Sequence, residues 1–297
     1  MRVDPYYIAN LSSALDQTQL TQQQLTSEVS SGLAVTSIGS DPVAAAENVQ
    51  FLNQIQRDDS FTQTSGLTQG MLQVSDSALG SVVTQLNQAI SLATQGSNGT
   101  LNAADQKSIS NQISGIRDEV LSLANTAYQG QYVFGGSQTT SAPFQLDNST
   151  SPATVTYTGD STVNALVTPN GQSISLNVPG NQIFTSSTAN VMNALSSLVT
   201  DFANGSTGSA ATDLSSLNTA LNFVSQQRVT LDNSINQLSS ASSAATSEAT
   251  QLTTVQTNLM QADIPAVSTQ LSLTESQQTA LINVIAALGS NSLFSKL

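Results

Sequence analysis

The sequence predicts a mainly α-helical protein with a small β-rich insertion, in which helices from both chain ends form a long antiparallel coiled-coil or helical-bundle rod. Three observations predict this fold class. Apolar residues recur at heptad spacing near both ends of the chain, a longer heptad frame fills the C-terminal half, and a segment rich in Gly, Pro and Thr lies in the middle. The 297 residues suffice for roughly two domains of about 150 residues each.

The two chain ends carry matching heptad seams. The N-terminal seam consists of Ile8, Leu11, Leu15, Thr18, Gln22, Leu25 and Val29, and the C-terminal seam of Ile264, Val267, Leu271, Thr274, Gln278, Leu281, Ile285 and Leu288. Both seams have a Thr and a Gln in the middle, and polar seam residues restrict register and partner choice in a coiled coil. We therefore expect the two helices to pair, with Gly32 ending the first. The alternative is two unrelated amphipathic helices.

A longer seam precedes the C-terminal helix. Its positions are Leu214, Leu217, Leu221, Val224, Arg228, Leu231, Ile235, Leu238, Ser242, Ala245, Ala249, Leu252, Gln256 and Leu259. A helix of this extent is on the order of 70 Å long and needs equally long partners to bury its stripe. The first expected partner begins at Asp41-Pro42, a capping carboxylate followed by proline in the first turn. Its apolar positions are Leu72, Leu79, Val82, Leu86, Ala89 and Ala93.

A third helix is expected after the break at residues 96–99, with Asn102 as its cap. Its apolar positions are Ile109, Ile113, Ile116, Val120, Leu123 and Ala127. We expect this third helix to pack with the two long helices in a helical bundle.

Residues 131–184 have the composition of a β-rich segment. Residues 153–157 alternate polar and apolar side chains, and residues 163–167 and 173–178 flank a turn that contains Asn170-Gly171. Asn-Gly tolerates the positive φ of tight turns, so these flanks predict a hairpin. A helix is expected at residues 191–202, after which the chain returns to its starting end, so both termini should lie far from the insertion.

These elements divide the chain into five segments. Residues 1–40 form an N-terminal coiled-coil helix and turn, 41–130 and 188–262 the two halves of the helical rod, 131–187 the outer β-rich insertion, and 263–297 the C-terminal coiled-coil helix.

Composition excludes several classes of function. Charged residues make up 8% of the chain, against about 25% in ordinary globular proteins, so the surface is polar without being charged. Such a surface packs against a neighbour without stripping water from ions. The net charge of −13 with six basic residues argues against a nucleic-acid partner. The chain contains no Cys and no His, which removes disulfides, most zinc sites and His-based triads.

The sequence also lacks the usual targeting and membrane signals. The first residues have no basic stretch followed by an apolar run, so we expect no secretory signal peptide. No run approaches the roughly 18 apolar residues of a membrane span, and no membrane partner is expected.

Few residues could carry chemistry, and each has a structural interpretation. The acidic candidates are Asp58-Asp59, Asp118-Glu119, Asp201 and Asp213. Acids on a polar helix face are usually solvated, so we expect no catalytic, cofactor-binding or metal-binding residues and no cofactor. Gly135-Gly136 is too sparse for a phosphate loop and is interpreted as a hinge into the insertion. Arg228 is either a buried specificity charge or, the favoured interpretation, an edge residue whose head reaches water.

Several short motifs lie in the N-terminal half of the chain and near its C-terminus. In the N-terminal half they are Ser30-Ser31-Gly32-Leu33, Ser40-Asp41-Pro42 with the following Val43-Ala44-Ala45-Ala46, Ser75-Asp76-Ser77-Ala78-Leu79, Asn98-Gly99-Thr100-Leu101, Leu123-Ala124-Asn125-Thr126 and Gln131-Tyr132-Val133-Phe134-Gly135-Gly136. Near the C-terminus they are Asp263-Ile264, Gln277-Gln278-Thr279-Ala280-Leu281 and residues 292–297. These motifs resemble the flagellin superfamily, and in particular its hook-filament junction branch, the type 3 hook-associated proteins. The resemblance covers residues 1–136 and 220–297, and the Tyr-x-Phe-Gly-Gly motif discriminates best between the branches.

The resemblance implies a structural subunit of the bacterial flagellum that is not an enzyme. The implied partners are further copies of the chain in a ring, a neighbouring hook-associated junction protein, flagellin and an export chaperone. Export through the flagellar type III channel, without a cleaved signal peptide, would place it extracellularly at the hook-filament junction. Flagellin itself is the alternative. A cytosolic coiled-coil scaffold and an enzyme in a flagellin-like frame are the rivals from other classes, and the absence of His excludes an HExxH-type enzyme.

Overall fold

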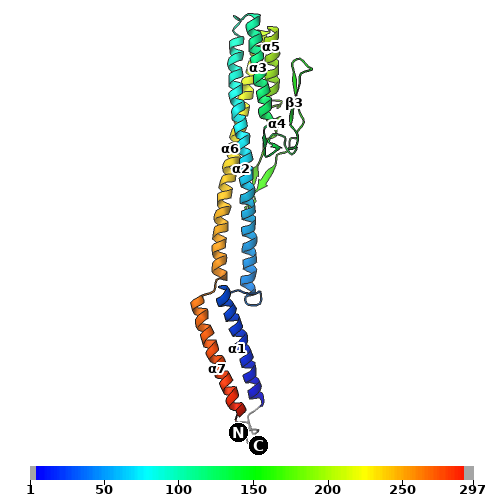
Figure 1. Cartoon of the computed structure of the whole chain (residues 1–297). Coiled ribbons are helices and arrows are strands. Elements are labelled where there is room, and N and C mark those ends of the chain that lie inside the picture. Colours follow the sequence, from blue (N-terminus) through cyan, green and yellow to red (C-terminus); the bar gives the residue numbers. More distant parts are fainter. Residues whose placement is uncertain (1–4, 291–297) are drawn as a thin grey trace. The chain divides into compact units, whose positions relative to one another are not determined.

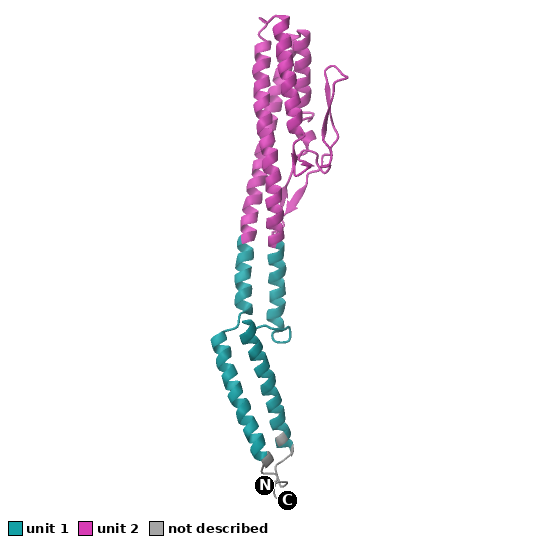
Figure 2. Cartoon of the chain, viewed as in Figure 1, with its two compact units in different colours: residues 1–57, 247–297 teal, residues 58–246 magenta. Residues whose placement is uncertain are grey.

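The computed structural model describes residues 5–290. The chain forms two compact units (Figure 2): unit 1 comprises residues 1–57 and 247–297, and unit 2 comprises residues 58–246. The two longest helices, α2 (Pro42–Gly96) and α6 (Thr207–Met260), each contribute residues to both units. The predicted fold class, mainly α with a small β-rich insertion, is confirmed.

Unit 1 contains the pair of helices from the two chain ends. Helix α1 (Pro5–Ser31) packs antiparallel to α7 (Ile264–Ser290), as Figure 1 shows. The seam positions whose burial is described are buried or half-buried, except Ile264, which is exposed. Gly32 ends α1 with a φ of 72° and donates from its N–H to the carbonyl of Glu28 at 2.9 Å. The predicted pairing of the terminal helices and the predicted end of the first are both confirmed.

Unit 2 is built around one hydrophobic core. Helices α3 (Ala103–Ala124) and α5 (Val191–Asn204) pack against each other and share the core with the unit 2 parts of α2 and α6. The long seam of α6 contributes buried residues at Leu217, Val224, Leu231 and Leu238. The predicted bundle is therefore confirmed, although α6 begins at Thr207, two turns before the first seam residue identified in the sequence.

The two predicted helix starts are confirmed by their caps. Asp41 Oδ1 accepts hydrogen bonds from the N–H groups of Val43 and Ala44, both at 3.0 Å, and Asn102 Oδ1 accepts from the N–H of Asp105 at 2.9 Å. Each acceptor satisfies amide donors that lack a partner within the first turn of the helix.

The end of α3 differs from the prediction. The helix ends at Ala124, and Ala127 lies in strand β1 (Ala127–Tyr128), opposite Tyr132 of β2 (Gln131–Tyr132). Asn125 exchanges two hydrogen bonds of 2.9 Å with the backbone of Phe144 through its side-chain amide. The apolar pattern of a helix continues through Ala127, but the hydrogen bonds between Asn125 and the insertion end the helix at Ala124.

The insertion consists of antiparallel strand pairs. In addition to β1–β2, β3 (Phe144–Asp147) pairs with β4 (Thr154–Tyr157), and β5 (Ala165–Val167) pairs with β6 (Ser173–Ser175). The predicted hairpin is confirmed: Gly171 has a φ of 82° and donates to the carbonyl of Thr168 at 2.9 Å. A short helix that the sequence did not indicate, α4 (Gly180–Ile183), follows.

The Gly135-Gly136 segment is a packed corner, not the hinge that the sequence suggested. Both glycines are buried, and a Cβ atom at Gly136 would overlap Asp160. The Tyr157 hydroxyl closes the corner, because its one O–H lies within hydrogen-bonding distance of the carbonyls of Phe134, at 3.0 Å, and of Asp160, at 2.7 Å. Close backbone approach, rather than mobility, requires glycine here.

Candidate assembly surface

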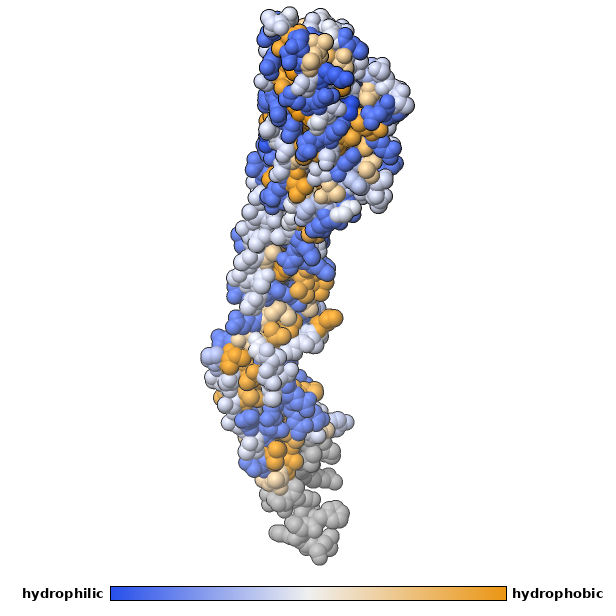
Figure 3. Space-filling model, turned by 45° about the horizontal axis from the view of Figure 1, so that its top comes forward, coloured by the Kyte–Doolittle hydropathy of each residue, from blue (hydrophilic) through white to orange (hydrophobic). Residues whose placement is uncertain are grey.

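Exposed apolar side chains gather in unit 1. Its exposed large hydrophobic residues are Tyr6, Tyr7, Leu20, Leu33, Ile38, Val43, Val49, Leu52, Val255, Ile264, Leu273, Ile282 and Val284. Unit 2, which holds more of the chain, has four among its residues: Leu67, Val163, Val167 and Val229. Orange patches mark apolar side chains on the face shown in Figure 3. Exposed apolar side chains gathered on one part of a protein are typical of a contact surface.

The α1/α7 pair buries little apolar surface of its own. Among its residues with described burial, Leu25 is the one hydrophobic side chain that is buried, while the polar Glu28 and Thr274 are buried as well. Thr274 donates to the carbonyl of Gln270 at 2.8 Å, and Gln24 donates to Glu28 at 3.0 Å. A two-helix pair with half-buried seams leaves apolar faces available to further helices.

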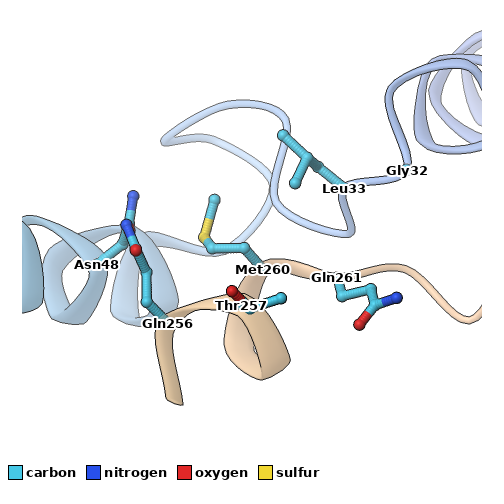
Figure 4. A pocket seen from close by; sticks show the side chains of 7 residues that line it. All are labelled: Gly32, Leu33, Asn48, Gln256, Thr257, Met260 and Gln261. Atoms are coloured by element: carbon cyan, nitrogen blue, oxygen red, sulfur yellow. The ribbon is translucent and has the colours of Figure 1, made fainter. Parts of the chain in front are cut away.

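A hollow of about 500 Å³ lies where the turn after α1 meets the end of α6 (Figure 4). Ala34 donates to the carbonyl of Met260 at 2.7 Å, and Ala262 donates to the carbonyl of Gly32 at 2.9 Å, so two short segments run antiparallel along it. Asn48 and Gln256 hydrogen-bond to each other on its wall at 2.7 Å. Among residues 5–290, those that line the hollow are all uncharged.

The acidic residues that are adjacent in the sequence have different surroundings. Asp58 is fully buried while Asp59 is exposed. Asp118 forms an ion pair of 2.9 Å with Arg117, and Glu119 is exposed. Within residues 5–290 no group of three or more acidic side chains is arranged to hold a metal ion.

Asp201 and Asp213, which are isolated in the sequence, are brought together by the fold. Burial, followed by a hydrogen bond with Asp201 and charge repulsion from it, raises the pKa of Asp213 to about 6. The two side chains therefore interact across the junction of α5 and α6. The two residues are twelve positions apart in the sequence, and no local pattern indicates that the turn between α5 and α6 brings their side chains together.

Arg228 matches neither interpretation from the sequence completely. Its side chain is partly exposed, as an edge residue would be, yet it forms an ion pair with Asp76 of α2. The heptad frame placed Arg228 at the interface correctly, but its partner lies 152 positions away and could not be identified from spacing.

Among residues 5–290, none of the helices combines the length and the apolar character that a membrane-spanning segment requires.

The fold and the apolar surface of unit 1 define a mainly helical protein with exposed apolar contact faces. Residues 6–139 match the family model of the bacterial flagellin N-terminal helical region. The chain is 30% identical to flagellar hook-associated protein 3 of Escherichia coli over 283 residues, which cover 86% of this chain and 85% of the relative. The chain therefore belongs to the flagellar hook-associated protein 3 family.

Solved structures show the same fold. Flagellar hook-associated protein 3 of Legionella pneumophila superimposes with a TM-score of 0.62 at 14% identity, over 71% of this chain and 98% of that one. A flagellar junction protein, FlgL from Legionella pneumophila, superimposes with a TM-score of 0.56 at 14% identity, over 65% of this chain and 99% of that one.

Proposed function

We propose that this protein is a structural subunit at the hook-filament junction of the bacterial flagellum, where it forms a ring that adapts the hook to the filament and lets flagellin assemble. The observation that carries this proposal is the concentration of exposed apolar side chains on unit 1, in a chain of the hook-associated protein 3 family. A subunit surrounded by neighbours requires faces of this kind, because each neighbour buries what the free chain exposes.

The proposed partners are further copies of this chain, a neighbouring hook-associated junction protein, flagellin and an export chaperone. The low content of charged residues supports contacts with proteins, since few ions would lose water in the contact. In this proposal the terminal segments 1–40 and 263–297 contact the neighbours, segments 41–130 and 188–262 space them, and the insertion 131–187 faces outward. Nucleic acid and membrane are not proposed partners.

The proposed location is the extracellular flagellum, reached through the flagellar type III channel in an unfolded state without a cleaved signal peptide. The absence of cysteine is compatible with such passage, because no disulfide has to form afterwards. The proposed role involves no catalysis, and it draws on surfaces of the chain rather than on a pocket with reactive groups.

Flagellin, the filament subunit, remains the alternative, because a filament subunit needs the same apolar contact faces. Immunogold labelling of intact flagella separates the two: a band at the hook end supports the junction role, whereas labelling along the filament supports flagellin. Absence from sheared extracellular filaments and hooks would favour a cytosolic scaffold instead.

A deletion strain tests the role itself. Cells that lack the protein should build hooks, fail to retain filaments and release flagellin as monomer. A copy without residues 285–297 should be produced but should not restore motility, and a copy without the insertion should be less impaired. Normal swimming of the deletion strain, or complete rescue by the truncated copy, would overturn the proposal.

A further inference from the structure

The β5–β6 hairpin has an open outer edge along β5. The carbonyl of Asn164 accepts a hydrogen bond from the N–H of Leu176 at 2.8 Å, and the N–H of Asn164 donates to the side-chain oxygen of Asn177 at 2.7 Å. The N–H of Thr168 donates to the carbonyl of Gln172 at 2.7 Å. These backbone groups therefore point toward β6. Because the direction alternates along an antiparallel strand, the N–H and C=O groups of Val163, Ala165 and Val167 point away from it.

Nothing in the described residues satisfies this outer row. No hydrogen bond within residues 5–290 outside the hairpin's own ladder involves the backbone of Val163, Ala165 or Val167. The side chains of Val163 and Val167 are 46% and 61% exposed, and Ala165 between them is exposed as well. Opposite side chains of the hairpin, Leu166 and Ile174, pack toward the core.

The edge also lacks the features that usually prevent strand pairing. Natural edge strands are protected by charged side chains, prolines or bulges. Residues 161–200 contain no charged side chain at all, and Pro169 lies in the turn beyond the strand. The outer face of β6 presents only Ser173 and Ser175, which are small and neutral.

The pattern of this edge is complementary to itself. If two copies pair antiparallel with Ala165 opposite Ala165, Val163 of each copy lies opposite Val167 of the other. All three residues then form hydrogen-bonded pairs, because each directs its backbone groups outward, and the exposed valines pack in cross-strand contacts. We propose that β5 is a docking edge for β5 of a second copy of this chain, which joins the two hairpins into a four-stranded sheet.

Charge favours this site for contact between two copies. Each chain carries a net charge of −13, so copies repel each other in general, and the charge-free hairpin is a place where they approach at low cost. The contact is two-fold, so it joins copies in pairs and differs from the head-to-tail contacts of a ring. With three residues on each side it is small, and the dimer should be weak and evident only at high concentration.

Sedimentation of the full-length chain over a concentration series tests the proposal. We expect a reversible monomer-dimer equilibrium, accompanied by slower hydrogen exchange of the Ala165 and Val167 amides at high concentration. Ala165→Pro removes an outward N–H without removing a bond of the hairpin, and Val167→Lys places a charge on the edge. Each should raise the dissociation constant at least about tenfold, since Ala165→Pro removes the one Ala165–Ala165 hydrogen-bonded pair and Val167→Lys removes both Val163–Val167 apolar pairs.

Ser173→Lys is the matched control, because it adds the same charge to the same face but on β6. Its dimer should persist close to the parent level. A chain that remains monomeric at all concentrations would overturn the proposal, and so would a dimer unaffected by both β5 variants. Equal weakening by Ser173→Lys and Val167→Lys would indicate stacking of faces and would also overturn it. Circular dichroism shows whether Ala165→Pro is still folded. Val167→Lys tests the same edge without changing the backbone of β5.

Discussion

Arg228 of α6 and Asp76 of α2 form a two-pronged ion pair in which Nε donates to Oδ1 at 2.8 Å and Nη2 donates to Oδ2 at 3.1 Å. The guanidinium lies over Gly80, the next turn of α2, where a Cβ atom would already be in van der Waals contact with it. The hydrogen bonds to Asp76 raise the pKa of Arg228, and the pair fixes the register of the two long helices at this level.

Removal of this ion pair should destabilise unit 2 modestly. The side chains of Arg228 and Asp76 are 34% and 22% exposed, so solvent screens the pair, and Arg228→Met should lower the free energy of unfolding by about 1 kcal/mol. Lys107→Met, which removes an exposed charge on α3, should have little effect. A double-mutant cycle with Asp76→Asn, followed by urea denaturation, measures the coupling, and a coupling energy near zero would contradict the assignment.

A charge within the long seam should unfold the bundle. Leu231 is 2% exposed, so Leu231→Asp buries an uncompensated carboxylate and should cost several kcal/mol, about 3 or more. Val229 lies two positions earlier on the same helix and is 57% exposed, so Val229→Asp should be nearly neutral. Thermal melts of both variants decide the point, and similar melting temperatures would show that the seam is not the buried face.

The α1/α7 pair should be the least protected helical part of the free chain. Because Leu25 is its one buried hydrophobic side chain among residues with described burial, the pair gains little from packing until neighbours cover it. Hydrogen exchange of the monomer should be fast in α1 and α7 and slow in the unit 2 parts of α2 and α6. Strong protection of α1 and α7 before assembly is the result that would refute this expectation.

The carboxyl pair at the α5–α6 junction should make stability depend on pH. The pKa of Asp213 is raised to about 6 in the folded chain from its ordinary value of 3.8, so the folded state holds the proton more tightly. The free energy of unfolding should therefore fall as the pH rises between these two values, and change little above them on account of this group.

Asp213→Asn resembles the protonated form and should remove this pH dependence while raising the melting temperature at neutral pH. Glu119→Gln, an exposed acid on α3, serves as the control. Melting temperatures measured below and above the window give the comparison, and an unchanged pH profile in Asp213→Asn would rule out the raised pKa of Asp213 as its cause.

Gly136→Ala should disrupt the corner at the entry to the insertion. Gly136 combines a φ of 72° with a position at which a Cβ atom would overlap Asp160, whereas Gly171 has a φ of 82° and open space around it. Gly171→Ala should thus cost about 1–2 kcal/mol from backbone strain alone, and Gly136→Ala should cost more. Limited proteolysis and denaturation reveal the difference, and equal effects would show that the corner adjusts without penalty.

Local chemistry specifies several elements of this fold, and these could be predicted from the amino-acid sequence. Heptad spacing defined the terminal seams and the long seam of α6, Asp41 and Asn102 fixed two helix starts, and Asn170-Gly171 fixed the hairpin turn. These features depend on residues within a few turns of one another, so periodicity and caps suffice to recognise them. The absence of histidine and cysteine was likewise visible in the sequence.

Features that join residues distant in the sequence depend on tertiary packing. It ended α3 at Ala124 because Asn125 bonds to Phe144, gave Arg228 its partner, brought Asp201 to Asp213 and packed Gly136 against Asp160. It also decided which apolar side chains remain exposed, since exposure depends on the neighbour that covers a face and not on the residue type. Contacts of this kind form between residues that share no local period, so their geometry arises only when the helices and strands pack together.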